Sequence, residues 1–140
     1  MKSHAVHAAL SILFVVCSTP LTFAEDLAPV PVQYGGEADF DACSPWAIAD
    51  GIDTLPEKML PVRSGPGPEY PVVGRIPAEK LFAVCDQNDD ESWFGIVYPT
   101  TDEQFEKECE LGAGVAERID YAGICPFGWV EAKNVKPMTG

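Results

Sequence analysis

The chain of 140 residues carries 22 acidic and 9 basic side chains, which gives it a formal net charge of −13 at pH 7. This excess of negative charge repels nucleic acid phosphates and anionic lipid headgroups, so we expect neither as a partner. The charge either keeps the chain in solution or attracts a basic protein or a cation. A chain of this length is sufficient for one modest domain, and the sequence shows no internal repeat.

Residues 1–24 are predicted to be a signal peptide. A weakly basic start precedes the apolar run 8–16, and Ala24 ends a small-residue cleavage signal. The run is too short to span a bilayer, which needs about 20 residues. Val16 is bulkier than the residue that normally precedes a lipidated cysteine, which argues against a lipoprotein anchored at Cys17. We therefore expect a periplasmic or secreted protein without a membrane span, and both histidines leave with the signal peptide.

Residues 25–42 contain prolines, glycines and acidic residues without sustained periodicity. This composition predicts a flexible leader ahead of the folded domain. Val30, Val32 and Tyr34 alternate, however, which is also the pattern of an edge strand. We expect the folded domain itself to cover residues 43–137.

Short apolar runs separated by turn residues predict a series of strands. We expect these strands at residues 43–52, 60–63, 72–76, 81–85, 93–98 and 124–130, with a single turn and a last short strand at 134–137. The loop 86–92 is acidic but lacks the glycine and the terminal glutamate of a calcium loop, so we interpret it as a solvated hairpin turn. The pattern as a whole indicates an all-β domain.

The connection formed by residues 100–123 is longer than a small barrel needs between two strands. Thr101 and Gln104 form a capping-box pattern, which predicts a helical turn over residues 102–111. The segment is rich in acidic residues and carries Cys109. We interpret it as an insertion in the all-β domain.

An ordered set of motifs runs through the domain. A strand ends at Arg63, the turn Ser64-Gly65-Pro66-Gly67 follows, Tyr70 leads into Val72-Val-Gly74, and Gly128-Trp129-Val130 closes the set. This set resembles the bacterial SH3-like (SH3b) domain family over about residues 43–137. The resemblance implies a small SH3-like barrel with one long, partly helical insertion. It also implies a module that binds cell-wall peptides or protein partners.

Four cysteines remain after the signal peptide, and an even number in a small exported domain predicts two disulfides with three possible pairings. A zinc site is the alternative, but the chain has no Cys-x-x-Cys pair, so we expect neither a metal site nor a cofactor. We expect Cys109–Cys125 to close the insertion, because its two ends must meet, and Cys43–Cys85 to join the first strand to the third. The resemblance supports this pairing.

We expect no catalytic activity. Serine and cysteine nucleophiles need a base, most often histidine, and the mature chain has no histidine. The four cysteines are expected to be oxidised, which removes the thiolate nucleophile. A carboxylate pair stays chemically open, because glycosidases need only two acids, but nothing in the sequence assigns such a pair to a cleft.

Aromatic residues supply the remaining recognition chemistry. Neighbours alternate across a strand, so Trp93 and Phe94 cannot both face the core, and neither can Trp129 and Val130. We predict a ligand-binding surface of rings flanked by acids of the insertion. Its residues are Tyr70, Trp93, Tyr98, Trp129, Glu106 and Glu110. The alternative is that the rings fill the core.

Arg63, Gly65 and Gly67 are predicted to be structural. We expect the two glycines to adopt backbone conformations that a side chain would strain. Arg63 should lie on the outward face of its strand and hydrogen-bond the loop or a nearby acid. The alternative role for Arg63 is direct contact with a ligand.

Two functions follow from these features. The first is a non-catalytic module of the bacterial envelope that recognises a cell-wall peptide, a glycan or a protein partner. The second is an acidic inhibitor or immunity-type protein that blocks a basic hydrolase, and its affinity should fall as salt is added. The sequence leaves the ligand and the oligomeric state open.

Overall fold

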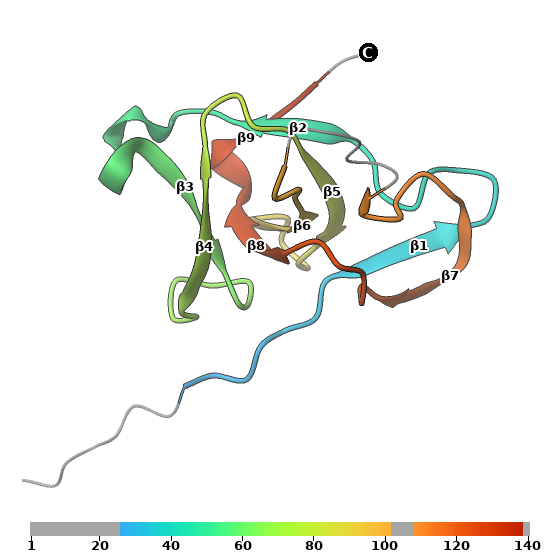
Figure 1. Cartoon of the computed structure of the whole chain (residues 1–140). Helices are drawn as coiled ribbons and strands as arrows, with labels where there is room; N and C mark the ends of the chain where they lie inside the picture. Colours follow the sequence, from blue (N-terminus) through green and yellow to red (C-terminus); the bar gives the residue numbers. More distant parts are fainter. Residues whose placement is uncertain (1–25, 102–107, 139–140) are drawn as a thin grey trace, which may run out of the picture.

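The computed structural model describes residues 26–101 and 108–138 (Figure 1). The strands are β1 (Gln33–Glu37), β2 (Trp46–Ala49), β3 (Met59–Arg63), β4 (Val72–Pro77), β5 (Phe82–Gln87), β6 (Trp93–Val97), β7 (Val115–Asp120), β8 (Phe127–Glu131) and β9 (Val135–Pro137). Three short 3-10 turns are η1 (Ile52–Thr54), η2 (Pro56–Lys58) and η3 (Ala132–Asn134). The predicted all-β class is confirmed. No helix within these ranges is long and apolar enough to cross a bilayer.

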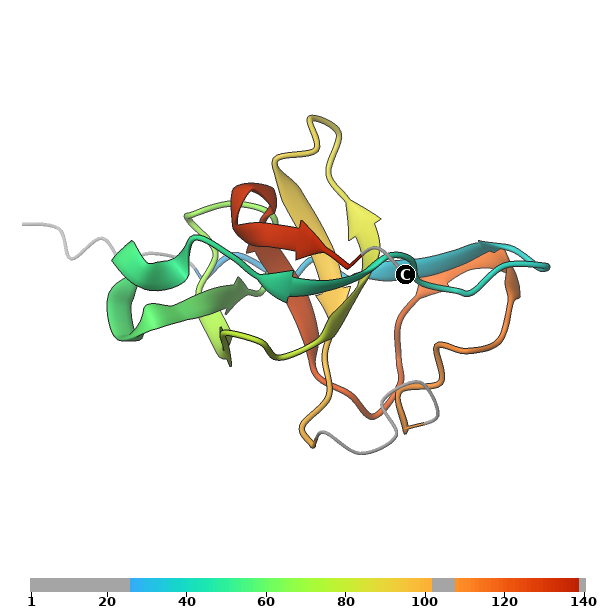
Figure 2. The same ribbon diagram turned by 90° about the horizontal axis from the view of Figure 1, so that it is seen from above.

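One curled antiparallel sheet forms the body of the domain (Figures 1 and 2). Its strand order is β4-β3-β8-β6-β5-β2-β9. Strands β4 and β9 stand at the two edges, and in the described part of the chain they do not pair with each other. The sheet is therefore open there, and the closed barrel that the resemblance implies is not found.

Apolar side chains on the inner face of this sheet form the main core. Leu60 and Val62 alternate with outward-facing residues along β3. Ile96 of β6 and Val130 of β8 complete the same layer, and all four side chains are almost fully buried. Burial stabilises the fold by roughly 1.5–3 kcal/mol for each such side chain. This alternation also fixes the register, because a slip of one residue would turn the apolar face outward.

Strands β1 and β7 form a separate two-stranded sheet beside the body (Figure 2). Gln33 pairs with Asp120 and Tyr34 with Ile119. The prediction of a flexible leader over residues 25–42 is therefore wrong from Val30 onward, since β1 is a strand and Val32 is fully buried. The alternation that begins at Val30 was the informative pattern.

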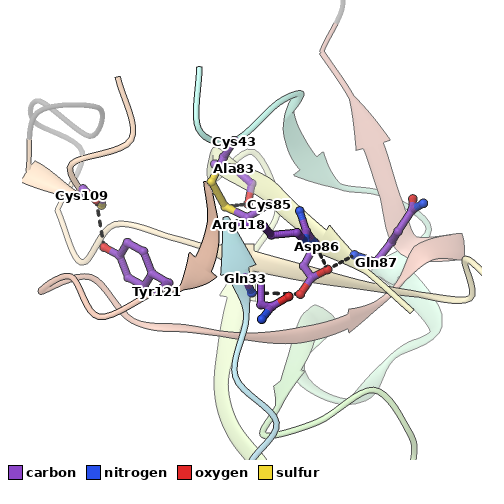
Figure 3. Close-up of a disulfide and its surroundings, with 9 residues drawn as sticks. All are labelled: Gln33, Cys43, Ala83, Cys85, Asp86, Gln87, Cys109, Arg118 and Tyr121. Atoms are coloured by element: carbon purple, nitrogen blue, oxygen red, sulfur yellow. Dashed lines mark hydrogen bonds and ion pairs between the residues drawn. A yellow bond between two sulfur atoms is a disulfide. The ribbon is translucent and has the colours of Figure 1, made fainter. Parts of the chain in front are cut away.

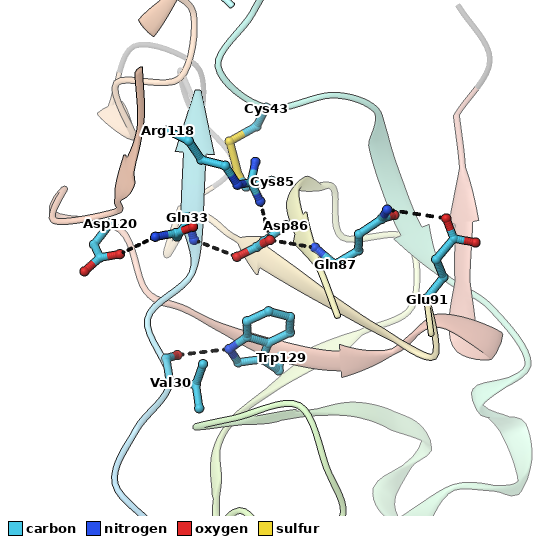
Figure 4. A network of polar contacts seen from close by, with 10 residues as sticks. All are labelled: Val30, Gln33, Cys43, Cys85, Asp86, Gln87, Glu91, Arg118, Asp120 and Trp129. Carbon is cyan, nitrogen blue, oxygen red and sulfur yellow. Dashed lines mark hydrogen bonds and ion pairs between the residues drawn. A yellow bond between two sulfur atoms is a disulfide. The ribbon is translucent and has the colours of Figure 1, made fainter. Parts of the chain in front are cut away.

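A half-buried carboxylate holds this second sheet to the body. Asp86 of β5 accepts a hydrogen bond from the main-chain N–H of Gln33 at 2.9 Å and forms an ion pair with Arg118 of β7 (Figure 4). The Asp86 side chain is only 11% exposed. Hydrogen bonds to charged groups contribute about 1.5–3 kcal/mol in such surroundings. Asp86 therefore helps to order β1, although Gly35 and Gly36 weaken that strand.

Two disulfides are present, Cys43–Cys85 and Cys109–Cys125. These are the pairs expected from the sequence. The first joins the segment after β1 to β5, next to Asp86 (Figure 3). The second lies beside Tyr121, whose hydroxyl donates to the Cys109 carbonyl oxygen at 3.0 Å. Each disulfide restricts the unfolded chain and stabilises the fold by about 2–4 kcal/mol.

The connection between β6 and β8 contains a strand that the sequence analysis did not predict. Strand β7 occupies Val115–Asp120, and its residues are mostly exposed. The helical turn expected over residues 102–111 falls mainly on 102–107, which lie outside the described residues. The first predicted strand, 43–52, is shortened to β2.

Candidate functional site

The two tryptophans of the predicted binding surface share the outer face of the body sheet. Trp93 pairs with Glu131, and Gly95 pairs with Trp129, across β6 and β8. Directly opposed residues and residues two apart in a strand point to the same side, so all four lie on the face opposite to the core residue Val130. Alternation thus predicted correctly that one residue of each neighbouring pair faces outward.

The outward rings are nevertheless covered. Trp93 is 8% exposed and Trp129 is 3% exposed. The prediction of an open aromatic surface is therefore wrong for these two residues. The physical reason is the N-terminal strap, which we define as residues 29–32, because Val32 packs against both rings and Val30 lies beside them.

The strap is bound to the body by its own main chain. The indole N–H of Trp129 donates to the Val30 carbonyl oxygen at 3.0 Å (Figure 4). The Val30 N–H donates to the Ser64 carbonyl oxygen at 2.8 Å, and the Tyr121 N–H donates to the Val32 carbonyl oxygen at 2.8 Å. The polar group of Trp129 is thus satisfied inside the protein, and Trp129 is a structural residue.

Trp93 has a different environment, because it borders a groove of about 350 Å³. We call this the Trp93 groove. Its lining residues are Leu55, Pro56, Leu60, Pro61, Arg63, Val72, Arg75, Trp93, Glu131, Lys133 and Asn134. A second hollow of about 420 Å³ shares Trp93, Glu131 and Lys133 with it, and extends the lining towards Pro68.

The groove forms where two neighbouring strands separate. Strands β3 and β8 pair only at Arg63 and Trp129. Two residues before Arg63 stands Pro61, which has no N–H for a ladder hydrogen bond. Arg75 pairs with Pro61 across β3 and β4 and lies on the same outer face. The sequence of β3 therefore opens the sheet and places Arg63 and Arg75 at the opening.

Basic side chains gather in this groove, although the chain as a whole is strongly acidic. Arg75 pairs with Glu57 at 3.2 Å, and Lys133 pairs with Glu131. Arg63 donates from Nη1 to the Tyr70 carbonyl oxygen at 2.8 Å, and among the described residues it forms no ion pair with a carboxylate. The positive charge of Arg63 is therefore balanced by no direct neighbour in that part of the chain.

The indole N–H of Trp93 is also unused. Within residues 26–101 and 108–138 it makes no hydrogen bond, whereas the Trp93 main-chain N–H donates to the Asn88 side chain. The groove is thus lined by an aromatic ring and by an arginine whose guanidinium keeps free N–H groups. Such a pair suits a ligand that carries both an apolar part and an acceptor.

The other predicted ligand-binding residues lie elsewhere. The Tyr70 ring covers Gly65, and the Tyr98 hydroxyl lies over Gly74. Of the described hollows, the Trp93 groove and its extension include neither tyrosine in their lining. Burial raises the pKa of Tyr98, which packs against the main core. The structure therefore does not bring the four predicted rings together as one exposed surface.

The predicted acidic flank of the rings also changes. Glu106 lies outside the described residues. Glu110 is exposed next to Cys109 rather than at the Trp93 groove. Burial raises the pKa of Tyr121, and the negative charge of Glu110 adds to that rise. Glu110 thus acts electrostatically on the region of the second disulfide.

The contacts of the turn residues differ from one residue to the next. Arg63 hydrogen-bonds the loop through Tyr70. Gly65 is needed for space, because an added Cβ would lie 2.4 Å from atoms of the Tyr70 ring. An added Cβ at Gly67 would meet only the Glu69 carboxylate, which can move. Neither glycine has a positive φ, so the expected backbone strain is wrong.

Two of the basic residues that border the groove, Arg75 and Lys133, were not predicted from the sequence. Arg75 lies on the predicted second strand of the motif, and Lys133 follows Gly128-Trp129-Val130 in the turn η3. Alternation along β4 places Arg75 outside, so its exposure was readable from the sequence. Its position next to Arg63 was not, because that depends on the β3–β4 register.

The described acidic and sulfur side chains are the candidate ligands for a metal centre. In the portion of the chain that is described, no group of three or more His, Cys, Asp or Glu residues is arranged to hold a metal ion. Comparison of the chain with protein-family models, with curated proteins and with solved structures found no match.

Proposed function

We propose that this chain is an exported, non-catalytic SH3-like module of the bacterial envelope that binds a cell-wall peptide or a protein partner along the Trp93 groove. The observation that carries the proposal is the groove itself. It combines apolar walls, the ring of Trp93 and the guanidinium of Arg63, which has no carboxylate partner in the described part of the chain. A concave site with few polar groups on apolar walls is typical of ligand recognition.

Other features support the same proposal. Two disulfides fit an oxidising compartment outside the cytoplasm. The order of the motifs from Arg63 to Trp129 resembles the SH3b family, and Arg63 pairs with Trp129 in the sheet. The groove is lined by Arg63 at the first end of this motif and by Glu131, which follows its last residue Val130.

The test measures binding of the disulfide-intact chain to purified peptidoglycan and to an envelope extract. The variant Arg75→Glu/Lys133→Glu reverses two charges at the rim of the groove, where both side chains are largely exposed. We expect it to lower retention at least 10-fold, since opposed charges at a rim steer and hold a partner.

The matched control is Lys58→Glu/Lys136→Glu, which reverses two exposed lysines that do not line the groove. It should bind like the parent chain. Equal retention of the two double variants and the parent would overturn the assignment of binding to this groove.

A second function is favoured by the acidic character of the β1–β7 sheet. Exposed acids on this sheet and in the turn that follows β1 are Glu37, Asp39, Asp41, Glu117 and Asp120. An acidic inhibitor of a basic hydrolase would use this side. Its association with lysozyme as a probe should slow as salt is added, and Glu37→Gln/Glu117→Gln should weaken it at low salt only. Association that is unchanged by salt or by this variant would exclude the acidic mechanism.

A further inference from the structure

We propose that the Trp93 groove recognises the carboxylate of an extended peptide of at least three residues, with Arg63 as the carboxylate-binding residue. This inference deepens the proposed function and rests on it. Guanidinium groups bind carboxylates through two parallel N–H···O bonds, which gives both strength and orientation. Arg63 uses Nη1 for the Tyr70 carbonyl, so most of its five N–H donors stay available.

The hydrogen bond to Tyr70 prepares Arg63 for this role. It fixes a long, flexible side chain against the turn, and a fixed side chain loses less conformational entropy when a ligand binds. Arg63 is also half-buried, so water screens its charge less than that of a fully exposed arginine. The two other basic residues of the groove, Arg75 and Lys133, already have carboxylate partners and lie at its rim. Glu57 and Glu131 largely offset their charges, which leaves Arg63 as the cation without a carboxylate partner in the described part of the groove.

The minimum ligand length follows from the sheet. Arg63 lies on β3 and Trp93 on β6, with β8 between them. Gly95 lies opposite Arg63 across β8, and Trp93 is two residues further along β6. Two strand spacings of about 4.8 Å and two residues of about 3.4 Å each place the two side chains roughly 12 Å apart. An extended peptide advances about 3.3 Å per residue, so about three to four residues span this distance. A carboxylate at Arg63 thus places an apolar side chain, two or three residues away, over Trp93.

Proline side chains favour an extended ligand over a compact one. Pro56 and Pro61 line the groove, and Pro68 lines its extension. These rings are rigid and apolar, and they lack the N–H groups that would otherwise need partners. The groove thus offers apolar walls along its length, with polar groups at Arg63 and at the Trp93 indole.

The acidic character of the whole protein makes a preference for a peptide acid over the peptide amide informative. A chain with a net charge of −13 repels anions in general, so non-specific electrostatics would favour a neutral peptide over its acid. A preference for the acid therefore requires a local cationic site. Within the described residues the Trp93 groove provides such a site, because three basic side chains and a single carboxylate, that of Glu131, line it together.

The experiment uses nuclear magnetic resonance of the full chain with both disulfides formed and nitrogen labelled. The probes are N-acetyl-Leu-Ala-Ala with a free carboxylate, the same peptide as its amide, and acetate alone. The chain has three tryptophans, so three indole N–H resonances report on separate places. We expect the free acid to shift the Trp93 resonance and to bind at least 10-fold more tightly than the amide or acetate. The Trp129 resonance should stay in place, because its N–H is held by Val30.

Variants assign the recognition to the guanidinium. Arg63→Gln should abolish the preference for the acid, and Arg63→Lys should retain only part of it, because lysine lacks the planar fork. Arg63 also holds the turn, so a second variant avoids that risk. Arg75→Gln/Lys133→Gln should weaken binding of the acid about 3- to 10-fold through lost potential, while Lys58→Gln/Lys136→Gln should change it less than 2-fold.

The outcomes separate this inference from the proposed function. Equal binding of acid and amide, with a shifted Trp93 resonance, would overturn carboxylate recognition and leave a peptide-binding groove. If neither peptide shifts Trp93 while the charge-reversed groove variant still loses retention on peptidoglycan, the carboxylate inference fails and the binding module stands. If the groove variants also bind peptidoglycan like the parent, both proposals fail.

Discussion

Trp93 and Trp129 differ in how their indole N–H groups are used, although both lie on the outer face of one sheet and both are nearly buried. Trp129 donates to the N-terminal strap, and its contacts are completed by the protein itself. Trp93 is packed by the same Val32, but its N–H has no partner in the described part of the chain and its ring borders a groove. Burial alone therefore does not distinguish a ring with a structural role from a ring that is available to a ligand. The two rings differ in whether the indole N–H has a hydrogen-bond partner in the described part of the protein.

Among the variants that test this comparison, Trp129→Ala should have the largest effect on stability. Removing a buried tryptophan leaves a cavity and costs about 3–5 kcal/mol of unfolding free energy. The strap also loses the donor for Val30. We expect a denaturant midpoint well below that of the parent, and rapid proteolytic cleavage within the strap and β1.

Phenylalanine variants serve as controls, because they keep a ring and remove the N–H. Trp129→Phe leaves the Val30 carbonyl without its donor and should cost about 1–3 kcal/mol. Trp93→Phe removes an N–H that has no partner among the described residues, so it should cost less. Equal losses in the two variants, measured by urea unfolding, would contradict the distinction between the rings.

Removal of the first disulfide should have the next largest effect. The Cys43–Cys85 bond closes a sequence separation of 42 residues, and Cys109–Cys125 closes one of 16. Loop entropy predicts losses of about 3–4 kcal/mol, with the larger loss for the longer loop. Cys43→Ala/Cys85→Ala should also loosen β1, because the bond lies next to Asp86 (Figure 3). Hydrogen exchange of β1 that is slower in this variant than in Cys109→Ala/Cys125→Ala would contradict that link.

Two glycine-to-alanine variants should have smaller effects on stability, one beside the strap and one beside Arg63. An added Cβ at Gly95 would lie 2.6 Å from the Asp86 Cβ and 3.1 Å from a methyl group of Val32, so Gly95→Ala should push on the strap. Gly65→Ala should displace the Tyr70 ring and the carbonyl that holds Arg63. Each should cost about 1–3 kcal/mol by overpacking. Gly95→Ala should leave peptide binding intact, whereas Gly65→Ala should weaken it. The reverse pattern in a binding titration would show that the strap controls the groove.

Much of the body sheet was predictable because its inner face alternates. The residues Leu60 and Val62, with the glycine-proline turn after Arg63, determine both a strand and its end. The pair β1 and β7 was not predictable in the same way. Strand β1 contains two glycines, and most residues of β7 are exposed, so neither has an apolar face that marks it as a strand. Each is stabilised by the other and by Asp86.

The candidate site was predictable only in part. Alternation indicated that Trp93 and Trp129 face outward, but it did not identify the strap that covers them. Arg63 was expected outside and bonded to the loop, and both expectations are confirmed. The groove depends on the separation of β3 from β8 after a single pair, which is a property of tertiary register. No local pattern reports such a register.

The smallest expected effect is a loss of stability at alkaline pH. Burial raises the pKa of Tyr98 and Tyr121 above the ordinary value of 10.0, so the folded state keeps their protons to higher pH than the unfolded state does. The unfolded chain then releases protons first, and the stability contributed by the neutral hydroxyls is present below about pH 10 and lost as pH rises through the folded pKa values. A hydrogen bond from the Cys125 main chain partly offsets the rise in the pKa of Tyr121. The Tyr121 hydroxyl also donates to Cys109 and loses this bond when it ionises, so we expect Tyr121 to contribute more.

Urea unfolding at several pH values between neutral and strongly alkaline measures this slope, with tyrosinate absorbance as an independent record of the titration. Tyr121→Phe should flatten the alkaline decline more than Tyr98→Phe, although both variants lose some stability at neutral pH. Tyr121 packs edge-on against Tyr34 of β1, with ring centroids 5.5 Å apart, so its ionisation should loosen the two-stranded sheet before the body. Tyr98 lies on the main core and should affect the whole domain at once. If the unfolding free energy of Tyr121→Phe falls with pH as steeply as that of the parent, the alkaline sensitivity belongs to other groups. The two-stranded sheet and the body would then not differ in this respect.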